Sequence, residues 1–354
     1  MTEVSFAEWT SDNRVRQAVF HGLRADKKAR EVLREKPAAM RSTKPSAVPA
    51  SIQVTHPDRV IDPSTHTTKI QLVEYYSRVA PLMMEHLKNR PVSIVRAPDG
   101  INGQLFFQKH SDSVIPGMEQ LDPALDPDHP ALLTVAKPEG LISAAQMNVI
   151  EFHTWNAVKS YIHKPDRMTF DLDPGEGVRW PEIQEAASVL HAFLQELQLQ
   201  SFLKTSGGKG LHLVVPLKRL YDWDTVKNFS QAIVQHVAAT IPQRFVAKSG
   251  PQNRRGKIYI DYLRNGFGAT TIAAWSARAR PGLGVSVPIA WTELGGLESS
   301  AQWNIFNIHT RLKTGNDPWK NYLNAAQKLG EAMKRLGYIP RKKMPPTHNS
   351  RNGS

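Results

Sequence analysis

The chain has 354 residues, enough for a substantial hydrophobic core, and 40% of them are hydrophobic, as in an ordinary globular protein. Lys and Arg outnumber Asp and Glu by 45 to 32, and this net charge of +13 favours a polyanionic partner such as nucleic acid, although a generally basic soluble protein is the alternative. The absence of cysteine excludes disulfides and thiolate metal sites and fits a reducing cytoplasm, and no apolar run approaches the length of a membrane span.

The two ends of the chain differ in composition from its middle. Residues 1–36 mix aromatic residues with a basic, helical-looking run from Leu23 to Lys36, and they are too short to bury a core of their own. Residues 37–50 are rich in Pro, Ala, Ser, Thr and Lys, as linkers are. We therefore expect a main domain over residues 51–340 and a disordered basic tail over residues 341–354.

The first half of the main domain combines short strands with one clear helix. Apolar residues recur at helical spacing from about Lys69, and Pro91 ends that region. Residues 111–140 are rich in Pro and Asp and predict a loop. Strands are expected at Ile52–Thr55, Val92–Val95, Gln104–Phe107 and Val149–Trp155.

The second half alternates strands and helices. Helical spacing predicts helices that begin near Pro181, at an Asp224 cap and at Asp317. Because strands and helices are interspersed, the predicted class is α/β (α+β) with a mixed sheet. Strands are expected at Met168–Asp173, Phe202–Thr205, Leu211–Val215, Lys257–Tyr262 and Thr271–Arg280.

Asp171 and Asp173 carry the strongest chemical signal. Side chains alternate across a strand, so the two carboxylates share one face while the apolar residues around them share the other. Neighbouring carboxylates repel each other unless protons or a cation intervene, which gives the hypothesis of a site for a hard divalent metal. The alternative is that both residues only cap the Pro174-Gly175 turn.

A glycine-rich turn from Ser206 to Gly210 is a candidate anion site. Its three glycines let backbone N–H groups approach a phosphate, while Ser206 offers a hydroxyl and Lys209 a positive charge. It is not a P-loop, because the glycine spacing and the Lys-Ser/Thr ending are absent. An ordinary hairpin is the alternative. His212 follows on the next strand and should face away from its apolar side.

Asp261 supplies a possible third carboxylate. It alternates with Ile258 and Ile260 along a strand, so its side chain lies on the opposite face. If it joins Asp171 and Asp173, the three can hold two divalent cations about 3.5–4 Å apart for an in-line phosphoryl displacement, as in polymerases and nucleases. A structural aspartate paired with an arginine is the alternative.

Two further pairs could contact nucleotide or DNA. Arg278 and Arg280 alternate in an expected strand, so both guanidiniums would point the same way and suit triphosphate oxygens; a solvated pair is the alternative. Phe106 and Phe107 could stack on bases, as in single-strand binders, or could lie in the core.

Three ordered motifs resemble the polymerase domain of bacterial ligase D, which belongs to the archaeo-eukaryotic primase superfamily and works in non-homologous end joining. The resemblance runs from about Ile52 to Tyr338 and implies a primase-polymerase-like fold with a central mixed or antiparallel sheet flanked by helices. The segment Phe20–Lys27 resembles the C-terminal edge of a ligase OB domain, so residues 1–36 are expected to be a remnant of that domain without ligase activity. The motifs are Asp171-Leu172-Asp173-Pro174, Lys204-Thr205-Ser206-Gly207-Gly208-Lys209-Gly210-Leu211-His212 and Ile260-Asp261-Tyr262-Leu263-Arg264-Asn265, with Phe106-Phe107-Gln108-Lys109 in support.

The resemblance also implies a role for each matching position. The metal-binding catalytic carboxylates are matched by Asp171, Asp173 and Asp261. The nucleotide pocket is matched by His153, Ser206, Lys209, His212, Arg278 and Arg280. The pocket for the 5′-phosphate of the downstream strand is matched by Arg59 and Lys69, with His56 where the family more often has Asn, and the template aromatics are matched by Phe106 and Phe107.

The expected function is that of a DNA-repair nucleotidyltransferase that extends a primer 3′-hydroxyl at gaps and double-strand break ends. The resemblance implies two metal ions, Mn²⁺ in preference to Mg²⁺, and nucleoside triphosphates with a taste for ribonucleotides. It implies gapped or broken DNA with a 5′-phosphate, Ku and a ligase domain as partners, in the cytoplasm at the nucleoid and not at a membrane. Two alternatives stay open: a metal-dependent nuclease, because three carboxylates serve both chemistries, and a non-catalytic DNA-end-binding module.

Overall fold

The computed structural model describes residues 52–110 and 115–340 with their side chains, and the chain divides into two compact units, Met1–Pro45 and Ser46–Ser354. In the first unit it describes only the backbone of four strands, in which β1 pairs with β4 and β2 with β3, both antiparallel. Most of the helical run expected from Leu23, the 37–50 linker and the 341–354 tail lie outside the described residues. The four strands are β1 (Thr2–Ser5), β2 (Glu8–Trp9), β3 (Val15–Arg16) and β4 (Val19–Leu23).

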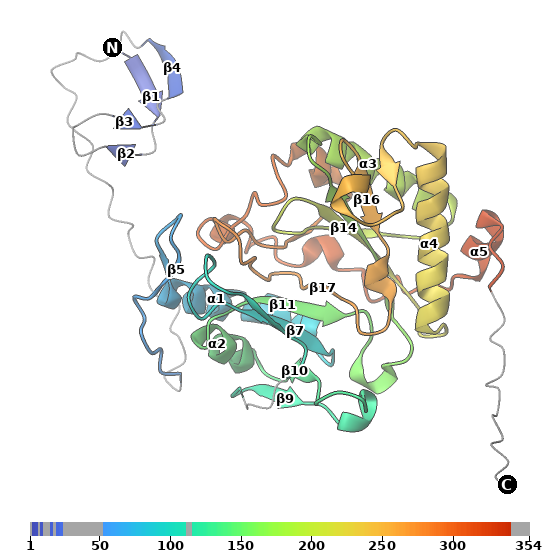
Figure 1. The fold of residues 1–354 in the computed structure, drawn as a ribbon, viewed down its shortest axis with the longest axis horizontal. Coiled ribbons are helices and arrows are strands. Elements are labelled where there is room, and N and C mark those ends of the chain that lie inside the picture. The colour runs from blue at the N-terminus through green and yellow to red at the C-terminus, as the bar shows by residue number, and fades with distance from the viewer. Residues whose placement is uncertain are drawn as a thin grey trace. The chain divides into compact units, whose positions relative to one another are not determined.

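The first of two six-stranded sheets in the second unit has the order β17-β11-β7-β10-β9, with β8 paired to β7, and every pairing in it is antiparallel. Helices α1 (Lys69–Leu87) and α2 (Pro138–Gln146) pack against each other and against this sheet (Figure 1). A hairpin of β5 (Val60–Asp62) and β6 (Thr67–Thr68) leads into α1. The sheet strands are β7 (Val92–Arg96), β8 (Phe106–Gln108), β9 (Met118–Gln120), β10 (Leu133–Val135), β11 (Val149–Trp155) and β17 (Thr270–Ile272).

The second sheet has the order β15-β16-β12-β14-β13-β18, antiparallel except for the parallel pair β15–β16. Helices α3 (Trp180–Glu196) and α4 (Trp223–Thr240) contact its central strand β12, and α5 (Gly330–Leu336) follows near the end of the described chain. The strands are β12 (Arg167–Pro174), β13 (Phe202–Thr205), β14 (Leu211–Pro216), β15 (Phe245–Val246), β16 (Ile258–Asp261) and β18 (Pro288–Ile289). Short 3-10 helices span Pro123–Leu125, Lys159–Tyr161, Pro251–Asn253, Leu263–Asn265, Trp291–Gly296, Ile308–Thr310 and Asp317–Trp319.

Strand β12 is stabilised by the apolar side chains that alternate with polar ones along it and are buried on one face. Met168, Phe170 and Leu172 are fully buried in the core between the sheet and its helices, and each such side chain stabilises the fold by roughly 2 kcal/mol. Asp171 and Asp173 are left on the other face, which is partly accessible. The α+β class with largely antiparallel sheets flanked by helices is therefore confirmed, with the strands divided between two sheets.

Two expectations about the first half and one helix cap were wrong. No strand forms over Ile52–Thr55, and residues 115–140 contain β9, β10 and the start of α2 instead of loop alone. These strands have three residues each, too few to show an alternation, and they exist because β9, β10 and β7 pair across the sheet. The cap of α4 is Asp222, whose carboxylate accepts from the Thr225 N–H at 2.8 Å, and Asp224 lies in the first turn.

The final helix is also shorter than helical spacing predicts. Asp317 begins only a 3-10 turn, and the α-helix spans Gly330–Leu336, followed by Gly337 with a left-handed φ of 67°. Leu323, an apolar position that a helix running on from Asp317 would turn inward, is 81% exposed. Tertiary contacts outweigh local propensity here, because the Trp319 indole donates to the carbonyl of Leu203 and fixes the chain in a turn.

Candidate active site

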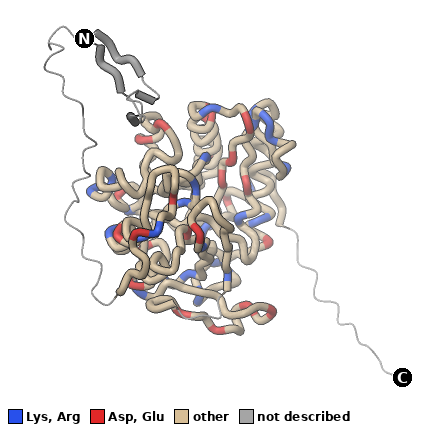
Figure 2. The backbone as a smooth tube through the Cα atoms, turned by 60° about the vertical axis from the view of Figure 1, so that its left-hand side comes forward, with Lys and Arg blue, Asp and Glu red and all other residues tan. Residues whose placement is uncertain are grey.

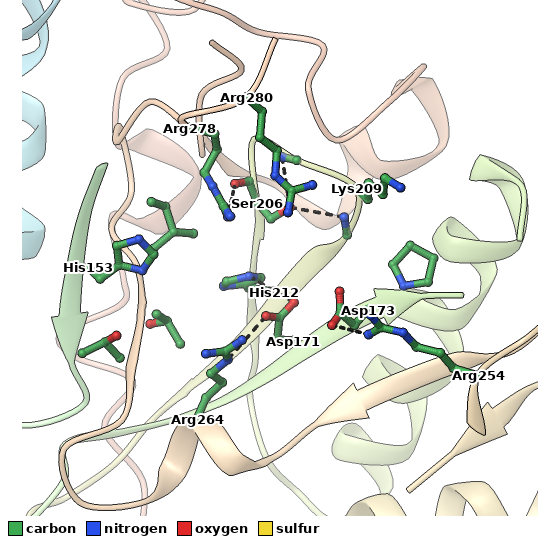
Figure 3. A pocket seen from close by; sticks show the side chains of 16 residues that line it. His153, Asp171, Asp173, Ser206, Lys209, His212, Arg254, Arg264, Arg278 and Arg280 are labelled. Atoms are coloured by element: carbon green, nitrogen blue, oxygen red, sulfur yellow. Dashed lines mark hydrogen bonds and ion pairs between the residues drawn. The ribbon is translucent and has the colours of Figure 1, made fainter. Parts of the chain in front are cut away.

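A polar cavity of about 280 Å³ lies where the two sheets meet, and Figure 3 shows its side chains pointing toward one another. Strand β11 of the first sheet contributes His153, and strand β12 of the second contributes Asp171 and Asp173. Most of the side chains predicted to bind metal and nucleotide therefore line one cavity. Its described lining residues are His153, Asp171, Asp173, Pro174, Ser206, Gly208, Lys209, Gly210, His212, Arg254, Arg264, Thr270, Thr271, Ile272, Arg278 and Arg280.

The three predicted carboxylates are grouped by strand pairing. Strands β12 and β16 are antiparallel with Asp171 directly opposite Asp261, and Asp173 follows two residues along the same face of β12. Asp171 and Asp173 line the cavity, whereas Asp261 is buried beside Asp171 and is not itself part of the lining. The register of two strands thus brings together residues that lie ninety positions apart in the sequence.

Cationic side chains hold each carboxylate. Arg264 lies between two of them, with Nε 3.1 Å from Oδ2 of Asp261 and 3.7 Å from Oδ2 of Asp171. Nε2 of His212 is 3.2 Å from Oδ1 of Asp171 on the other side. Arg254 places Nη1 2.5 Å from Oδ2 of Asp173. No role was predicted for either arginine, although Arg264 lies within the Ile260–Asn265 motif and Arg254 within the basic stretch before β16.

The surrounding charges and burial shift the pKa values of two of these carboxyls in opposite directions. Burial raises the pKa of Asp171, but His212 and Arg264 outweigh it and hold that pKa well below its usual range. Burial, together with the negative charge of Asp171, raises the pKa of Asp261 despite the opposing effect of Arg264. The position between the two carboxylates therefore favours a cation, as the placement of the Arg264 guanidinium already shows.

Asp171, Asp173 and Asp261 fit a divalent-metal site by ligand type and by strand register. Carboxylate oxygens are the ligands that hard cations prefer. The fit requires a rearrangement, because one oxygen from each carboxylate does not fall within a common 4.8 Å while Arg254 holds Asp173. The side chain of Asp173 is 41% exposed and can turn away from Arg254.

The glycine-rich turn is shaped by contacts with the neighbouring backbone. Gly207 has a left-handed φ of 67°, and a Cβ on Gly210 would lie 1.9 Å from the carbonyl oxygen of Leu172. The Ser206 hydroxyl accepts from the N–H groups of Gly208 and Gly210, both at 3.2 Å, and also contacts the Ser300 hydroxyl. Ser206 thus organises the turn, which presents the exposed Lys209 at the cavity next to Asp173 (Figure 3).

Glu151 joins two predicted nucleotide-binding residues. Its Oε2 is 2.7 Å from Nε2 of His153, and its Oε1 accepts from Nε of Arg278 at 3.1 Å and from the Ala279 N–H at 2.8 Å. Burial raises the pKa of Glu151, but these hydrogen bonds and charges lower it to about 2, so the carboxylate is ionised at neutral pH. The sequence signal was present, since Glu151 and His153 share one face of β11.

Arg278 and Arg280 reach the cavity from an irregular segment and not from the strand predicted for them. Strand β17 ends at Ile272, so the strand predicted over Thr271–Arg280 is right for its first two residues and wrong for the rest. Both arginines lie in the irregular segment that follows. The Arg280 side chain lies against Gly208, with Nη1 3.6 Å from the position of a Cβ there. The two guanidiniums enter the cavity from the side opposite Arg264 (Figure 3).

The two phenylalanines are on the surface and not in the core. Phe106 and Phe107 are 42% and 50% exposed on β8. The Phe107 ring contacts the His153 ring edge to face, with centroids 5.6 Å apart. The pair therefore offers an exposed aromatic surface immediately beside the cavity.

His56, Arg59 and Lys69 form a separate group that does not line this cavity. The Lys69 N–H donates to the Arg59 carbonyl at 2.8 Å, and the Arg59 N–H donates to the His56 carbonyl at 3.1 Å. Burial and the charge of Arg59 lower the pKa of Lys69, whose ammonium donates to the Thr55 carbonyl at 2.8 Å. Among the described residues neither Arg59 nor Lys69 has a carboxylate partner, so the group suits an anion.

Comparison with known proteins points to one family. Residues 68–319 match the family model described as LigD, primase-polymerase domain. The chain is 50% identical over 347 residues to a multifunctional non-homologous end joining protein LigD of Pseudomonas aeruginosa, a match that covers 95% of this chain and 41% of that protein. It is 32% identical over 250 residues to the LigD protein of Mycolicibacterium smegmatis, covering 70% of this chain and 33% of that protein.

The fold is likewise similar to a solved structure. The polymerase domain from Mycobacterium tuberculosis ligase D in complex with DNA superposes with a TM-score of 0.69 at 27% sequence identity, covering 78% of this chain and 99% of that one. The chain thus spans about two fifths or less of the length of the first two relatives, and nearly all of a solved domain. By its family match, its relatives and its fold, the chain belongs to the LigD primase-polymerase domain family.

Proposed function

We propose that the protein is a DNA-repair polymerase, which adds ribonucleotides or deoxyribonucleotides to a primer 3′-hydroxyl at gaps and at double-strand break ends. The observation that carries the proposal is the cavity in which Asp171 and Asp173 face a cluster of cations. Among its described lining residues, five Lys or Arg side chains stand against two Asp side chains. This excess of positive charge suits a triphosphate better than it suits a neutral ligand.

The metal site belongs to the proposal. Asp171, Asp173 and Asp261 would hold two divalent cations, Mn²⁺ or Mg²⁺. Such ions activate the attacking 3′-hydroxyl and neutralise the leaving pyrophosphate in polymerases. Arg254 and Arg264 occupy the carboxylates in the structure and would give up these contacts when cations bind.

The protein's own side chains position the nucleotide. Arg278 and Arg280 would bind the triphosphate bidentately from one side of the cavity, and Lys209 from the turn next to Asp173. Glu151 neutralises and orients Arg278 and fixes the His153 ring in the cavity lining, where it would contact the nucleotide. No lining side chain offers a well-placed general base, since burial lowers the pKa of His212 to about 4 and its Nε2 faces Asp171.

Two surfaces outside the cavity would place the DNA. Phe106 and Phe107 would stack on template bases. The ring contact between Phe107 and His153 places this aromatic surface next to the cavity. Arg59 and Lys69, with His56, would bind the 5′-phosphate of the downstream strand. Elsewhere Lys and Arg are interspersed with Asp and Glu along the described chain (Figure 2), so these local groups, rather than one basic face, would set the register.

The relatives suggest the wider setting. Those proteins are named for non-homologous end joining, and the solved neighbour holds DNA, so we propose that this chain works on broken DNA beside Ku and a ligase domain of the same or a longer polypeptide. Residues 1–36 would be the remnant of a ligase OB domain, joined by the 37–50 linker. None of the helices in the described part of the chain has the length and apolar character that a membrane span requires.

Primer extension tests the proposal against its rivals. The chain is incubated with Mn²⁺, nucleoside triphosphates and a gapped duplex that carries a 5′-phosphate and a labelled primer. A lengthened primer is expected. A shortened strand would support a metal-dependent nuclease, and salt-dependent binding without any product would support a non-catalytic end-binding module.

A further inference from the structure

A second group of metal-ligating side chains lies outside the candidate active site. His110, Asp126 and His129 each place one ligand atom within 4.8 Å of the others, and they form the one group of three or more His, Asp or Glu side chains in residues 52–110 and 115–340 to do so. None of them lines the cavity described above. They gather beside β9 and β10, at the lower edge of Figure 1.

Backbone hydrogen bonds hold the three residues in place. Asp126 and His129 are joined in one turn, in which the His129 N–H donates to the Asp126 carbonyl at 3.1 Å. His110 lies two residues after the end of β8 and forms an isolated antiparallel bridge with Leu132, just beyond that turn. The Leu121 N–H in turn donates to the Leu132 carbonyl at 2.7 Å. The cluster is therefore built by two segments of chain that pairing keeps adjacent.

The contacts within the cluster leave one buried ring nitrogen without a hydrogen-bond partner among the described residues. Nδ1 of His129 is 3.1 Å from Oδ1 of Asp126, which an ordinary ion pair would explain. That pair does not explain His110, whose Nδ1 is buried and makes no hydrogen bond with any described residue. The two imidazole rings lie nearly parallel, 7° apart with centroids separated by 5.3 Å. A buried ring nitrogen without a partner is unfavourable unless something else binds it.

The ligand set points to a particular class of ion. Two imidazoles and one carboxylate are the ligands of borderline transition metals such as Zn²⁺, whereas Mg²⁺ and Ca²⁺ prefer oxygen alone. Ligands about 2.1 Å from one tetrahedral ion lie about 3.4 Å apart. Nδ1 of His129 and Oδ1 of Asp126 are already 3.1 Å apart, and all three ligand atoms lie within 4.8 Å of one another, so only a small closure is needed. The His129 side chain is 58% exposed and free to make that movement.

We propose that His110, Asp126 and His129 form a structural Zn²⁺ site, with water as the fourth ligand. The site would fasten the chain that leaves β8 to the turn at residues 126–129. Since β8 carries Phe106 and Phe107, the ion would steady the exposed aromatic surface from outside the active site. This proposal does not depend on the polymerase proposal, because it concerns metal binding by other residues.

Zn²⁺ binding to a tag-free, chelator-stripped chain tests the proposal. Asp171→Asn and Asp173→Asn are introduced together so that binding at those carboxylates does not contribute. We expect one Zn²⁺ per chain by calorimetric titration, and Co²⁺ should give the visible absorption of a tetrahedral site. Adding His110→Asn should weaken binding by more than the ~10–100-fold that changes to residues behind a metal ligand cause.

Two further variants make the result decisive. His309→Asn, at an exposed histidine outside the cluster, should leave Zn²⁺ affinity unchanged. His129→Gln alters a mostly exposed side chain, so it should fold and lose the site even if His110→Asn does not fold. The proposal is overturned if the Asp171→Asn/Asp173→Asn chain binds no stoichiometric Zn²⁺, or if it binds Zn²⁺ equally well with and without His129→Gln.

Discussion

Glu151→Gln tests how much the ionised Glu151 carboxylate contributes to stability and to the position of Arg278. The pKa of Glu151 is lowered from 4.5 to about 2 in the folded protein, and the residue is only 6% exposed. A pKa shift of that size corresponds to about 3 kcal/mol of folding free energy. Because Gln keeps the shape and can still accept from the Ala279 N–H, about 3 kcal/mol is an upper bound on the stability lost at pH 7.

The pH dependence has a defined sign. A carboxyl with a lowered folded pKa binds fewer protons when folded, so its contribution is fully present above about pH 4.5 to 5 and disappears as the pH falls through about 2. Urea unfolding without metal, at several pH values from 7 to 3, measures this difference. The stability gap between wild type and Glu151→Gln should narrow as the pH falls.

A matched control and a kinetic measurement complete the experiment. Glu298→Gln, at an exposed position, should change stability by no more than about 0.5 kcal/mol. Loss of the carboxylate also leaves Arg278 without its partner, so the KM for nucleotide should rise more than kcat falls. If Glu151→Gln and wild type were equally stable at pH 7 and lost stability identically as the pH falls, the ionised Glu151 carboxylate would contribute nothing to the fold.

Three further predictions follow from single contacts. Gly210→Ala places a methyl group 1.9 Å from the Leu172 carbonyl, so it should destabilise the protein by ~1–3 kcal/mol in thermal unfolding and reduce extension, whereas Gly295→Ala, with open space around it, should do neither. Phe107→Ala removes a half-exposed ring and should weaken single-stranded template binding by ~1–3 kcal/mol in a fluorescence titration with little change in stability; unchanged binding would remove Phe107 from the template surface. Lys69→Met should abolish any preference for 5′-phosphate over 5′-hydroxyl gaps in competition binding, and a retained preference would place the phosphate elsewhere.

Local patterns predicted the parts of the fold that depend on local physics. The alternation around Asp171 gave the right face of β12, and helical spacing gave the start of α1 at Lys69. Elements that depend on distant partners were missed, as in β9 and β10, whose three residues each form strands only through pairing. Leu323 shows the reverse error, since a helical spacing was present but tertiary contacts held the chain in turns.

The site was predictable in its residue types but not in its internal contacts. Spacing and resemblance identified the aspartates, and their convergence rests on the register that sets Asp171 opposite Asp261. The ion pairs of Arg254 and Arg264 could not be inferred, because one comes from a basic stretch with several candidates and the other depends on the strand pairing. Glu151 was accessible in principle, from its position two residues before His153 on β11.

Anomalous diffraction from crystals grown with Mn²⁺ and a non-hydrolysable nucleoside triphosphate would locate the metal ions and the nucleotide. We expect Mn²⁺ peaks within coordination distance of Asp171 and Asp173, with Asp261 at the ion nearest Asp171, Arg254 turned away, and the triphosphate against Arg278 and Arg280. Mn²⁺ bound elsewhere, or a nucleotide bound in this cavity with the three carboxylates still paired to Arg254 and Arg264, would rule out the proposed two-metal site.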